Sequence, residues 1–415
     1  MWIDEASPWM TDARVCELLD RVVARCVAEW PRKSGRVLLV LPERMRLLSG
    51  LGPFACHIVQ ALQNAFGDVR VLIAESPGAA PFSPAERSAV FPELSGETFV
   101  GRSERSDVIS RGTIPADVVM SCSGGLSAEA IPLSLPRSVV EAAFDGVVSL
   151  EQVVPDDLFG FTGPPVARWS AAGTAETFAA FGALAGATGA ENATANLSPP
   201  LRQCLLWADA RCWPATPRVD VALVRGVDLH GHPAIVGFYS GTDEQTYFQA
   251  ALLSRRTNVV ALETGAPRIV VMADGERFGS VWDLMRITPR VRMAVADMGE
   301  IVLIAPGLKH VAHDPNDAAL IAKLGYSSTA DLLERRADVP ELAARSWLET
   351  HLRHGSSEGR CRMLCATDDF DEALLALYLH PWNSATRCIA IVRKPRNRAG
   401  TSRPKAKSST SYPIP

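Results

Sequence analysis

Short runs of consecutive apolar residues alternate along this chain with segments that have helical periodicity. One run reads Val-Leu-Leu-Val-Leu-Pro after Arg36, and further predicted strands at 69–74, 116–121 and 300–307 are mostly apolar. Apolar runs without a polar alternation are typical of parallel strands that are buried on both faces. With the helical segments between them, they predict an α/β fold with parallel-rich sheets, in which function lies beyond the carboxyl ends of the strands.

The chain is too long for one typical core, since it has 415 residues, and this length predicts two α/β domains with an interdomain cleft. We place the N-terminal domain at 1–265 and the C-terminal domain at 266–395. Within the first domain, the segment 182–217 is rich in Ala, Gly, Asn, Thr and Pro, which predicts a loose excursion or long loop. Strands at 219–225 and 234–240 are predicted to form a β-hairpin.

The remaining residues, 396–415, are predicted to be a basic disordered tail. From residue 393 onward the chain has seven basic residues and no acidic ones, whereas its formal net charge is −4. Such a tail could contact nucleic acid or an acidic partner, but short basic tails often serve only solubility, so we do not favour nucleic-acid binding. The sequence leaves open whether the protein forms a homodimer.

The nine cysteines are scattered singles without CxxC spacing, which is typical of reduced thiols in a cytoplasmic protein. There is no basic-then-apolar leader, and no apolar run reaches the roughly 18 residues that a membrane span needs. The sequence therefore predicts a cytoplasmic protein with no membrane association.

Several segments in order along the chain carry a resemblance to a known family. They are 42–49 (Pro-Glu-Arg-Met-Arg-Leu-Leu-Ser), 152–155 (Gln-Val-Val-Pro), 290–297 with 301–307, and 354–360 (His-Gly-Ser-Ser-Glu-Gly-Arg). From about residue 36 to residue 366 the chain resembles the nickel-pincer lactate racemase family, most closely its branch of hydroxy-acid and sugar-acid epimerases. The resemblance implies two α/β domains and isomerase activity.

It also implies a cofactor mechanism. In that family a nickel ion sits in a pincer nucleotide that is tethered to a lysine as a thioamide and ligated by a histidine. The cofactor accepts hydride from Cα of a 2-hydroxy acid, and two further histidines take and return the hydroxyl proton.

The residue types that this mechanism needs are missing from the first domain. No lysine stands between Lys33 and Lys309, and His57 is the only histidine before His230. The sequence therefore argues against a tethered nickel-pincer nucleotide and leaves any cofactor unknown.

Residue by residue, the family histidines would fall near Ala79, Asp156 and 178–181, and the tether lysine near Val166. The nearest basic residue to that lysine position is Arg168. A guanidinium cannot form the thioamide and does not deprotonate near neutrality, so Arg168 is a candidate for binding substrate instead.

Two further arginines are candidates for holding an anionic substrate. Arg46 matches the arginine of the family's Asp-x-Thr-Arg and follows a predicted parallel strand, where it could form a bidentate pair with a carboxylate. Arg292 falls where the family has a substrate-binding basic residue. The alternatives are arginines that cover apolar surface or lie on a solvated helix face.

Candidates for proton transfer lie in two places. Asp156 could replace a lost histidine as general base if burial raises its pKa, although an Asp here could equally cap the following turn. In the segment 354–360, His354 and Glu358 are candidate catalytic residues. Ser356, Ser357 and Arg360 are candidates for binding substrate. The structural alternative is that a serine caps a helix and Glu358 pairs with Arg360.

His310 and His313 follow a predicted strand and are weak candidates for a metal site, because they supply only two ligands with one Asp nearby. His230 and His232 lie in the predicted hairpin turn, where solvent exposure explains them.

These observations lead to one leading hypothesis. The chain is a divergent lactate-racemase-like enzyme that acts at Cα of a hydroxylated small-molecule carboxylate without a tethered cofactor. Because one face lacks a base, a one-base epimerisation or elimination fits, which makes it an isomerase or a lyase. The alternatives are a non-catalytic small-molecule-binding or scaffold protein, a nickel-pincer-dependent racemase, and a metal-dependent lyase that uses His310 and His313.

Overall fold

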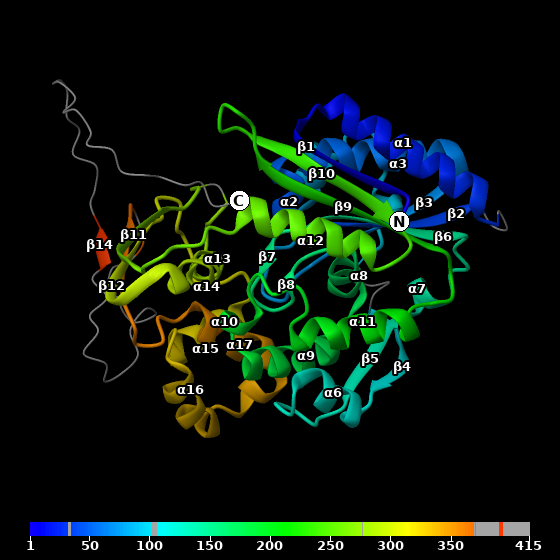
Figure 1. The fold of residues 1–415 in the computed structure, drawn as a ribbon. Helices are drawn as coiled ribbons and strands as arrows, with labels where there is room; N and C mark the ends of the chain where they lie inside the picture. Colours follow the sequence, from blue (N-terminus) through cyan, green and yellow to red (C-terminus); the bar gives the residue numbers. More distant parts are fainter. Residues whose placement is uncertain (32–34, 102–105, 276, 369, 371–389, 393–415) are drawn as a thin grey trace. The chain divides into compact units, whose positions relative to one another are not determined.

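The structure is a computed structural model that describes residues 1–31, 35–101, 106–275, 277–368, 370 and 390–392 (Figure 1). The chain forms two compact units. Unit 1 comprises Met1–Ala261 and Thr329–Gly355, and unit 2 comprises Leu262–Ser328 and the described residues from Ser356 onward. The chain thus returns to unit 1 for 27 residues, 329 to 355, a return that the predicted division at 265/266 does not include. The predicted tail lies outside the described residues.

Unit 1 is built on a six-stranded mixed sheet with the order β1-β10-β9-β6-β2-β3. Its strands are β1 (Ile3–Met10), β2 (Arg36–Leu41), β3 (Asp68–Ile73), β6 (Gly146–Gln152), β9 (Arg218–Val227) and β10 (Pro233–Gly241). Strands β9, β6, β2 and β3 are parallel, and β10 and β1 are added antiparallel. The predicted hairpin is confirmed as β9–β10.

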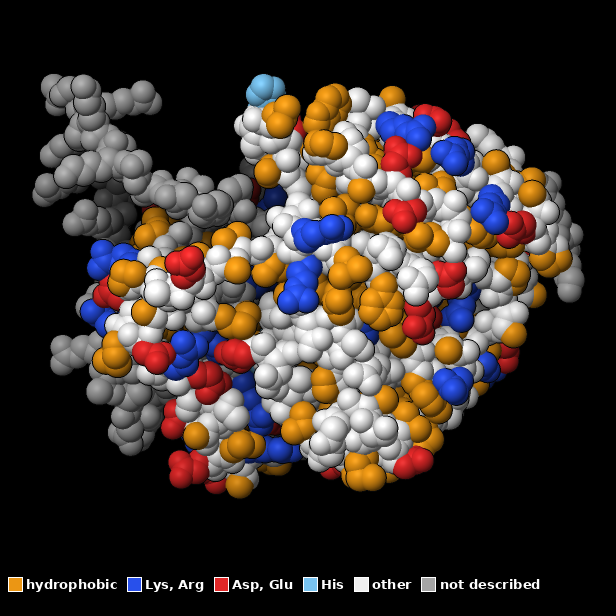
Figure 2. Space-filling view, in the orientation of Figure 1, with side chains coloured by type: hydrophobic (Ala, Val, Ile, Leu, Met, Phe, Trp, Pro, Cys, Tyr) orange, Lys and Arg blue, Asp and Glu red, His pale blue; other side chains and the backbone are white. Residues whose placement is uncertain are grey.

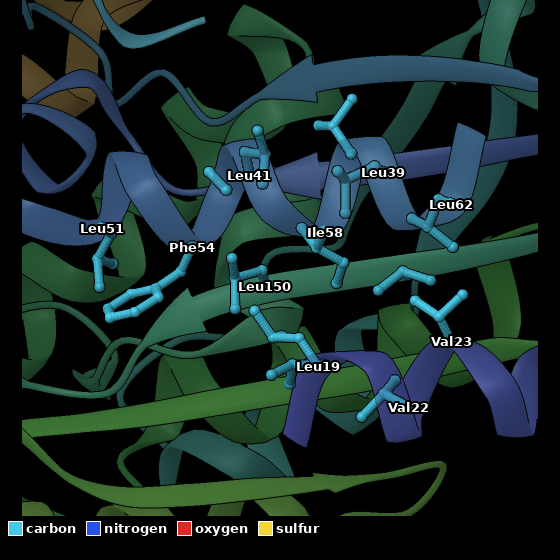
Figure 3. Packing of buried hydrophobic residues seen from close by; sticks show 14 of the residues in the cluster. Leu19, Val22, Val23, Leu39, Leu41, Leu51, Phe54, Ile58, Leu62 and Leu150 are labelled. Carbon is cyan, nitrogen blue, oxygen red and sulfur yellow. The ribbon is translucent and has the colours of Figure 1, made fainter. Parts of the chain in front are cut away.

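Alternate residues of β2 enter different cores, which is why the run is apolar throughout. Val37, Leu39 and Leu41 pack with the helices α1 (Asp12–Glu29) and α3 (Gly52–Phe66), which lie side by side (Figures 1 and 3). Leu38 and Val40 pack on the other face with α8 (Pro164–Ala172), α9 (Ala175–Thr188) and α11 (Pro200–Cys212). Helices on both faces of a parallel-rich sheet confirm the predicted α/β class.

Shorter elements complete unit 1. They are α2 (Arg44–Arg46), η1 (Leu47–Leu51), α4 (Pro84–Val90), η2 (Gly96–Thr98), β4 (Val108–Ile114), α6 (Ala116–Ser123), β5 (Ile131–Pro136), α7 (Arg137–Val140), β7 (Pro155–Asp156), β8 (Gly160–Phe161), α10 (Ala190–Ala193), α12 (Gln245–Asn258), α16 (Thr329–Arg335), η4 (Arg336–Asp338), η5 (Pro340–Arg345) and α17 (Ser346–Gly355). Among the return elements, α17 packs on α9, where Thr350 Oγ1 donates a hydrogen bond of 2.6 Å to the carbonyl oxygen of Gly182.

Two local predictions in unit 1 are wrong. The run 116–121 is the helix α6, which begins after an extended Pro115 and ends before Gly124, a glycine in the left-handed region; its buried residues are Val119 and Ser123, one turn apart. The segment 182–217 is largely helical, in α9, α10 and α11, because alanine is the best helix former and outweighs Gly182 and Gly186 inside α9, while Gly189 and the prolines Pro199 and Pro200 stand at helix ends.

Unit 2 has a four-stranded parallel sheet with the order β11-β12-β13-β14. Its elements are β11 (Ala266–Met272), α13 (Val281–Met285), α14 (Thr288–Val291), η3 (Arg292–Ala294), β12 (Val295–Ile304), α15 (Pro315–Leu324), β13 (Arg362–Thr367) and β14 (Ala390–Val392). Cys361 and Cys365 are both buried, as expected for small apolar residues beside and within a strand.

Acidic and basic side chains are interspersed on the face seen in Figure 2, in keeping with the small net charge. Within the described ranges, each helix is too short or too polar to cross a lipid bilayer.

Candidate functional site

A cluster of charged side chains lies at the carboxyl ends of the central strands of unit 1. Strand β2 ends at Leu41, and the short helix α2 places Arg46 close to the end of the neighbouring strand β6. Arg46 Nη1 lies 3.3 Å from Glu151 Oε1, and Arg46 Nη2 lies 3.5 Å from Glu43 Oε1. Ser76, which follows β3, donates a hydrogen bond of 3.0 Å to Glu43 Oε2. One guanidinium therefore stands between two carboxyl groups.

Glu151 has the environment of a group that exchanges protons near neutral pH. The residue is only 1% exposed. Its burial raises the pKa of its carboxyl to about 7, and the nearby carboxylate of Glu43 acts in the same direction. Arg46 and the backbone N–H of Gln152 lower this pKa and so oppose the effect of burial. Buried carboxyl groups with such values are suited to general acid–base work.

Of this cluster, sequence reasoning identified Arg46 and missed both carboxyl groups. Glu151 had a signal that could have found it, because it is an acidic residue in the run Gly-Val-Val-Ser-Leu-Glu-Gln of β6. Charged residues are almost never fully buried unless they are paired. Glu43 had only its position after the strand.

Two neighbouring aspartates after β6, Asp156 and Asp157, make different contacts. Asp156 Oδ1 accepts hydrogen bonds from the backbone N–H groups of Leu158 and Phe159, at 3.0 and 2.8 Å, which is the turn-capping alternative. It is Asp157 that reaches His354, with 2.9 Å between Oδ2 and Nδ1. His354 is buried at the end of α17, so this pair is a second acid–base group in unit 1.

The guanidinium of Arg168 forms hydrogen bonds with three side chains of the protein. It is 2% exposed and forms a fork with Asp209, with distances of 3.0 and 2.6 Å, and it also binds Asp220 and Ser149. Burial lowers the pKa of its guanidinium, but Asp209 and Asp220 outweigh this and raise it above its ordinary value. A side chain held in this way stabilises the contact between α8, α11 and the sheet; the geometry does not favour substrate binding.

In unit 2, Arg292 is buried and donates a hydrogen bond of 2.6 Å from Nη1 to the carbonyl oxygen of Ser356. In the loop that begins at Ser356, the Oγ of this serine accepts a hydrogen bond of 3.2 Å from the backbone N–H of Glu358. Arg360 pairs with Asp297 at 2.9 Å, in place of the expected Glu358. The carbonyl oxygen of Ser357 accepts a hydrogen bond of 3.0 Å from the backbone N–H of Arg360.

The predicted motif 354–360 is thus divided between the two units, with His354 in unit 1 and the remaining candidates in unit 2. His310 and His313 are together, with 3.1 Å between His310 Nε2 and His313 Nδ1. Across the residues that the structure describes, no group of three or more His, Cys, Asp or Glu side chains is arranged to hold a metal ion.

Comparison with solved structures identifies the class of fold, which is a lactate-racemase-like α/β fold. The chain is similar to a structural-genomics protein from Thermotoga maritima, with a TM-score of 0.76 and 17% identity, over 90% of this chain and 92% of that one. It is also similar to the lactate racemase apoprotein from Thermoanaerobacterium thermosaccharolyticum, with a TM-score of 0.63 and 13% identity, over 91% of this chain and 86% of that one. No family model and no curated protein matches the sequence.

The residues of α8 and α9 do not fit a tethered nickel-pincer nucleotide. Val166, at the position matched to the tether lysine, is buried in an apolar cluster with Trp169. Phe181 packs against Trp169 with 6.2 Å between the ring centroids, where the resemblance would need a ligating histidine. Apart from Lys33, the sequence of unit 1 has no lysine.

Proposed function

We propose that this protein acts at Cα of a small hydroxylated carboxylate, as an isomerase or lyase, through the Glu43–Arg46–Glu151 cluster. The observation that supports this most is the buried Glu151 carboxyl, whose pKa is raised to about 7 and which lies 3.3 Å from Arg46. An anion-binding guanidinium and a proton-exchanging carboxyl are then neighbours at the functional edge of a parallel-rich sheet.

Binding and proton transfer are coupled in this arrangement. A substrate carboxylate that binds Arg46 competes with ionised Glu151 for the same guanidinium, and ionised Glu43 already supplies one negative charge. Because like charges disfavour one another, the bound anion makes Glu151 a stronger base. A carboxylate bound by two guanidinium N–H groups would also be oriented.

The chemical step would transfer the Cα proton to Glu151. The C–H bond breaks, the O–H bond forms on Glu151, and the electron pair moves into the substrate carboxylate, where Arg46 stabilises the added charge. Return of the proton to the same face of Cα restores the starting material, and delivery of a proton to the opposite face gives the epimer. In an elimination, Glu151 passes the proton to the β-hydroxyl group, which leaves as water when the Cβ–O bond breaks. His354, oriented by Asp157, is a second proton carrier in unit 1.

A binding protein without turnover is the second candidate. Two observations favour it. Arg168 is bound by Asp209 and so does not favour substrate binding, and apolar residues stand at the positions where the family holds its cofactor.

Deuterium exchange separates the two candidates. A thermal-shift screen of hydroxy acids and sugar acids would first identify ligands, and NMR in D2O would then follow deuterium incorporation at Cα of each. We expect Arg46→Met to abolish binding and Glu151→Gln to abolish exchange while binding persists. The exposed Glu129→Gln serves as the matched control. Ligand binding with no exchange in the native protein would support the binding protein, and binding that survives Arg46→Met would exclude this site.

A further inference from the structure

Unit 2 contains a chain of hydrogen bonds that ends in an exposed imidazole. Asp283 Oδ2 lies 2.9 Å from His313 Nε2, and His313 Nδ1 lies 3.1 Å from His310 Nε2. Asp283 is itself fixed at the start of α13, because Ser280 Oγ donates to its carboxylate at 2.7 Å and accepts its backbone N–H at 3.0 Å.

The backbone holds the two histidines in this arrangement. The N–H of Val281 donates to the carbonyl oxygen of His310 at 3.0 Å, and the N–H of Lys309 donates to that of Gly279 at 2.9 Å. Both loops follow the carboxyl ends of the neighbouring parallel strands β11 and β12, which is the edge where α/β sheets bind ligands.

The direction of the protons follows from the carboxylate. Burial raises the pKa of Asp283. Hydrogen bonds from His313 and Ser280, together with the charge of Arg286, outweigh burial and bring this pKa below its ordinary value, so Asp283 is ionised. It accepts the Nε2–H of His313, whose Nδ1 then accepts the Nε2–H of His310. No residue that the structure describes forms a hydrogen bond with His310 Nδ1, which is left as an acceptor.

The same geometry argues against a metal ion at this place. Both ring nitrogens of His313 are occupied by protein partners, so His313 and His310 do not converge on one point. Burial and the charges of His313 and Lys309 lower the pKa of His310, while Asp283 opposes them, so its ring is neutral near pH 7.

We propose that unit 2 holds a binding site for a small anionic ligand that carries a hydroxyl group, in which His310 accepts the hydrogen bond of that hydroxyl group. The ligand hydroxyl group donates this hydrogen bond to His310 Nδ1, and no covalent bond is made or broken. His313 and Asp283 are positioning residues that keep the proton of His310 on Nε2 and so leave Nδ1 as an acceptor, and the exposed Lys309 supplies positive charge for the anion. The proposal does not depend on the proposed function of unit 1.

NMR of the full chain with ¹⁵N-labelled histidine tests this site directly. Glycolate, which has a carboxylate and a hydroxyl group, is the probe, and acetate, which lacks the hydroxyl, is the control. We expect glycolate to shift the His310 signals saturably and more tightly than acetate, and Lys309→Gln to weaken that binding several-fold.

The chain of hydrogen bonds from Asp283 to His310 can be tested separately, because the charge of Asp283 raises the pKa of His310. Asp283→Asn should lower the pH midpoint of the His310 titration, whereas the NMR signals of the exposed His230 in the β9–β10 turn should not respond to this substitution. Lys309→Gln leaves the hydrogen-bond chain intact and so keeps the ligand test valid if Asp283→Asn disturbs the loop. An unchanged His310 titration in folded Asp283→Asn, or equal shifts by glycolate and acetate, would overturn the proposal.

Discussion

Replacing Glu151 by glutamine should change how the stability of unit 1 depends on pH. The folded-state pKa of Glu151 is about 7, against an ordinary value of 4.5. A difference of about 2.5 pKa units corresponds to about 3 kcal/mol. Because the pKa is raised on folding, the folded state binds the proton more tightly than the unfolded state.

The sign follows from this. The contribution of Glu151 to the free energy of unfolding is fully present below about pH 4.5 and is lost progressively up to about pH 7, above which the loss is about 3 kcal/mol. Glutamine cannot ionise, so Glu151→Gln should lack this part of the pH dependence. The free energy of unfolding of the variant, minus that of the native protein, should rise by about 3 kcal/mol across this window.

Urea unfolding of both proteins between about pH 4.5 and about pH 8.5 measures this difference. The comparison cancels every other titrating group that the substitution leaves unaltered. Glu129→Gln makes the same chemical change at an exposed carboxylate and should give a profile parallel to that of the native protein. If Glu151→Gln also gives a parallel profile, burial does not raise this pKa, and the acid–base role of Glu151 loses its physical basis.

Two other substitutions test the packing around the site. Arg168→Met would leave Asp220 without this cation and the buried Asp209 with Arg218 at 3.3 Å as its remaining ion pair; urea unfolding should show a loss of about 3 kcal/mol, and a loss below about 1 kcal/mol would contradict the buried ion network. Gly160→Ala would place a methyl group 1.9 Å from the carbonyl oxygen of Asn196 at a φ of +76°, so a loss of more than about 2 kcal/mol is expected, and an alanine variant of native thermal stability would refute this close approach.

The sequence was a good guide to the elements whose burial pattern is simple. Strand β2 was predicted because a parallel strand buried on both faces has a continuous apolar run, and β3 because Arg70 is the only interruption among the apolar residues 69–73. Helix α6 was missed because Val118, Val119 and Met120 form the same kind of apolar run, and only tertiary packing shows that Met120 is half exposed.

The candidate site was harder to predict because its members are distant in sequence. Arg46 and Glu151 are separated by 105 residues, so their pairing depends on the order of β2 and β6 in the sheet. The exchange of roles between Asp156 and Asp157 depends on the exact path of one turn. Neither fact can be derived from periodicity or composition.

The return of residues 329–355 to unit 1 has a consequence for synthesis on the ribosome. Helix α17 covers α9 only after the whole of Leu262–Ser328 has been translated, so unit 1 cannot be completed in the order in which its residues emerge. A nascent chain released at residue 261 would expose the surface of α9 that Thr350 contacts. Expression of unit 1 alone therefore requires a linker that joins residue 261 to residue 329, since truncation at residue 261 would remove α17 from its place on α9.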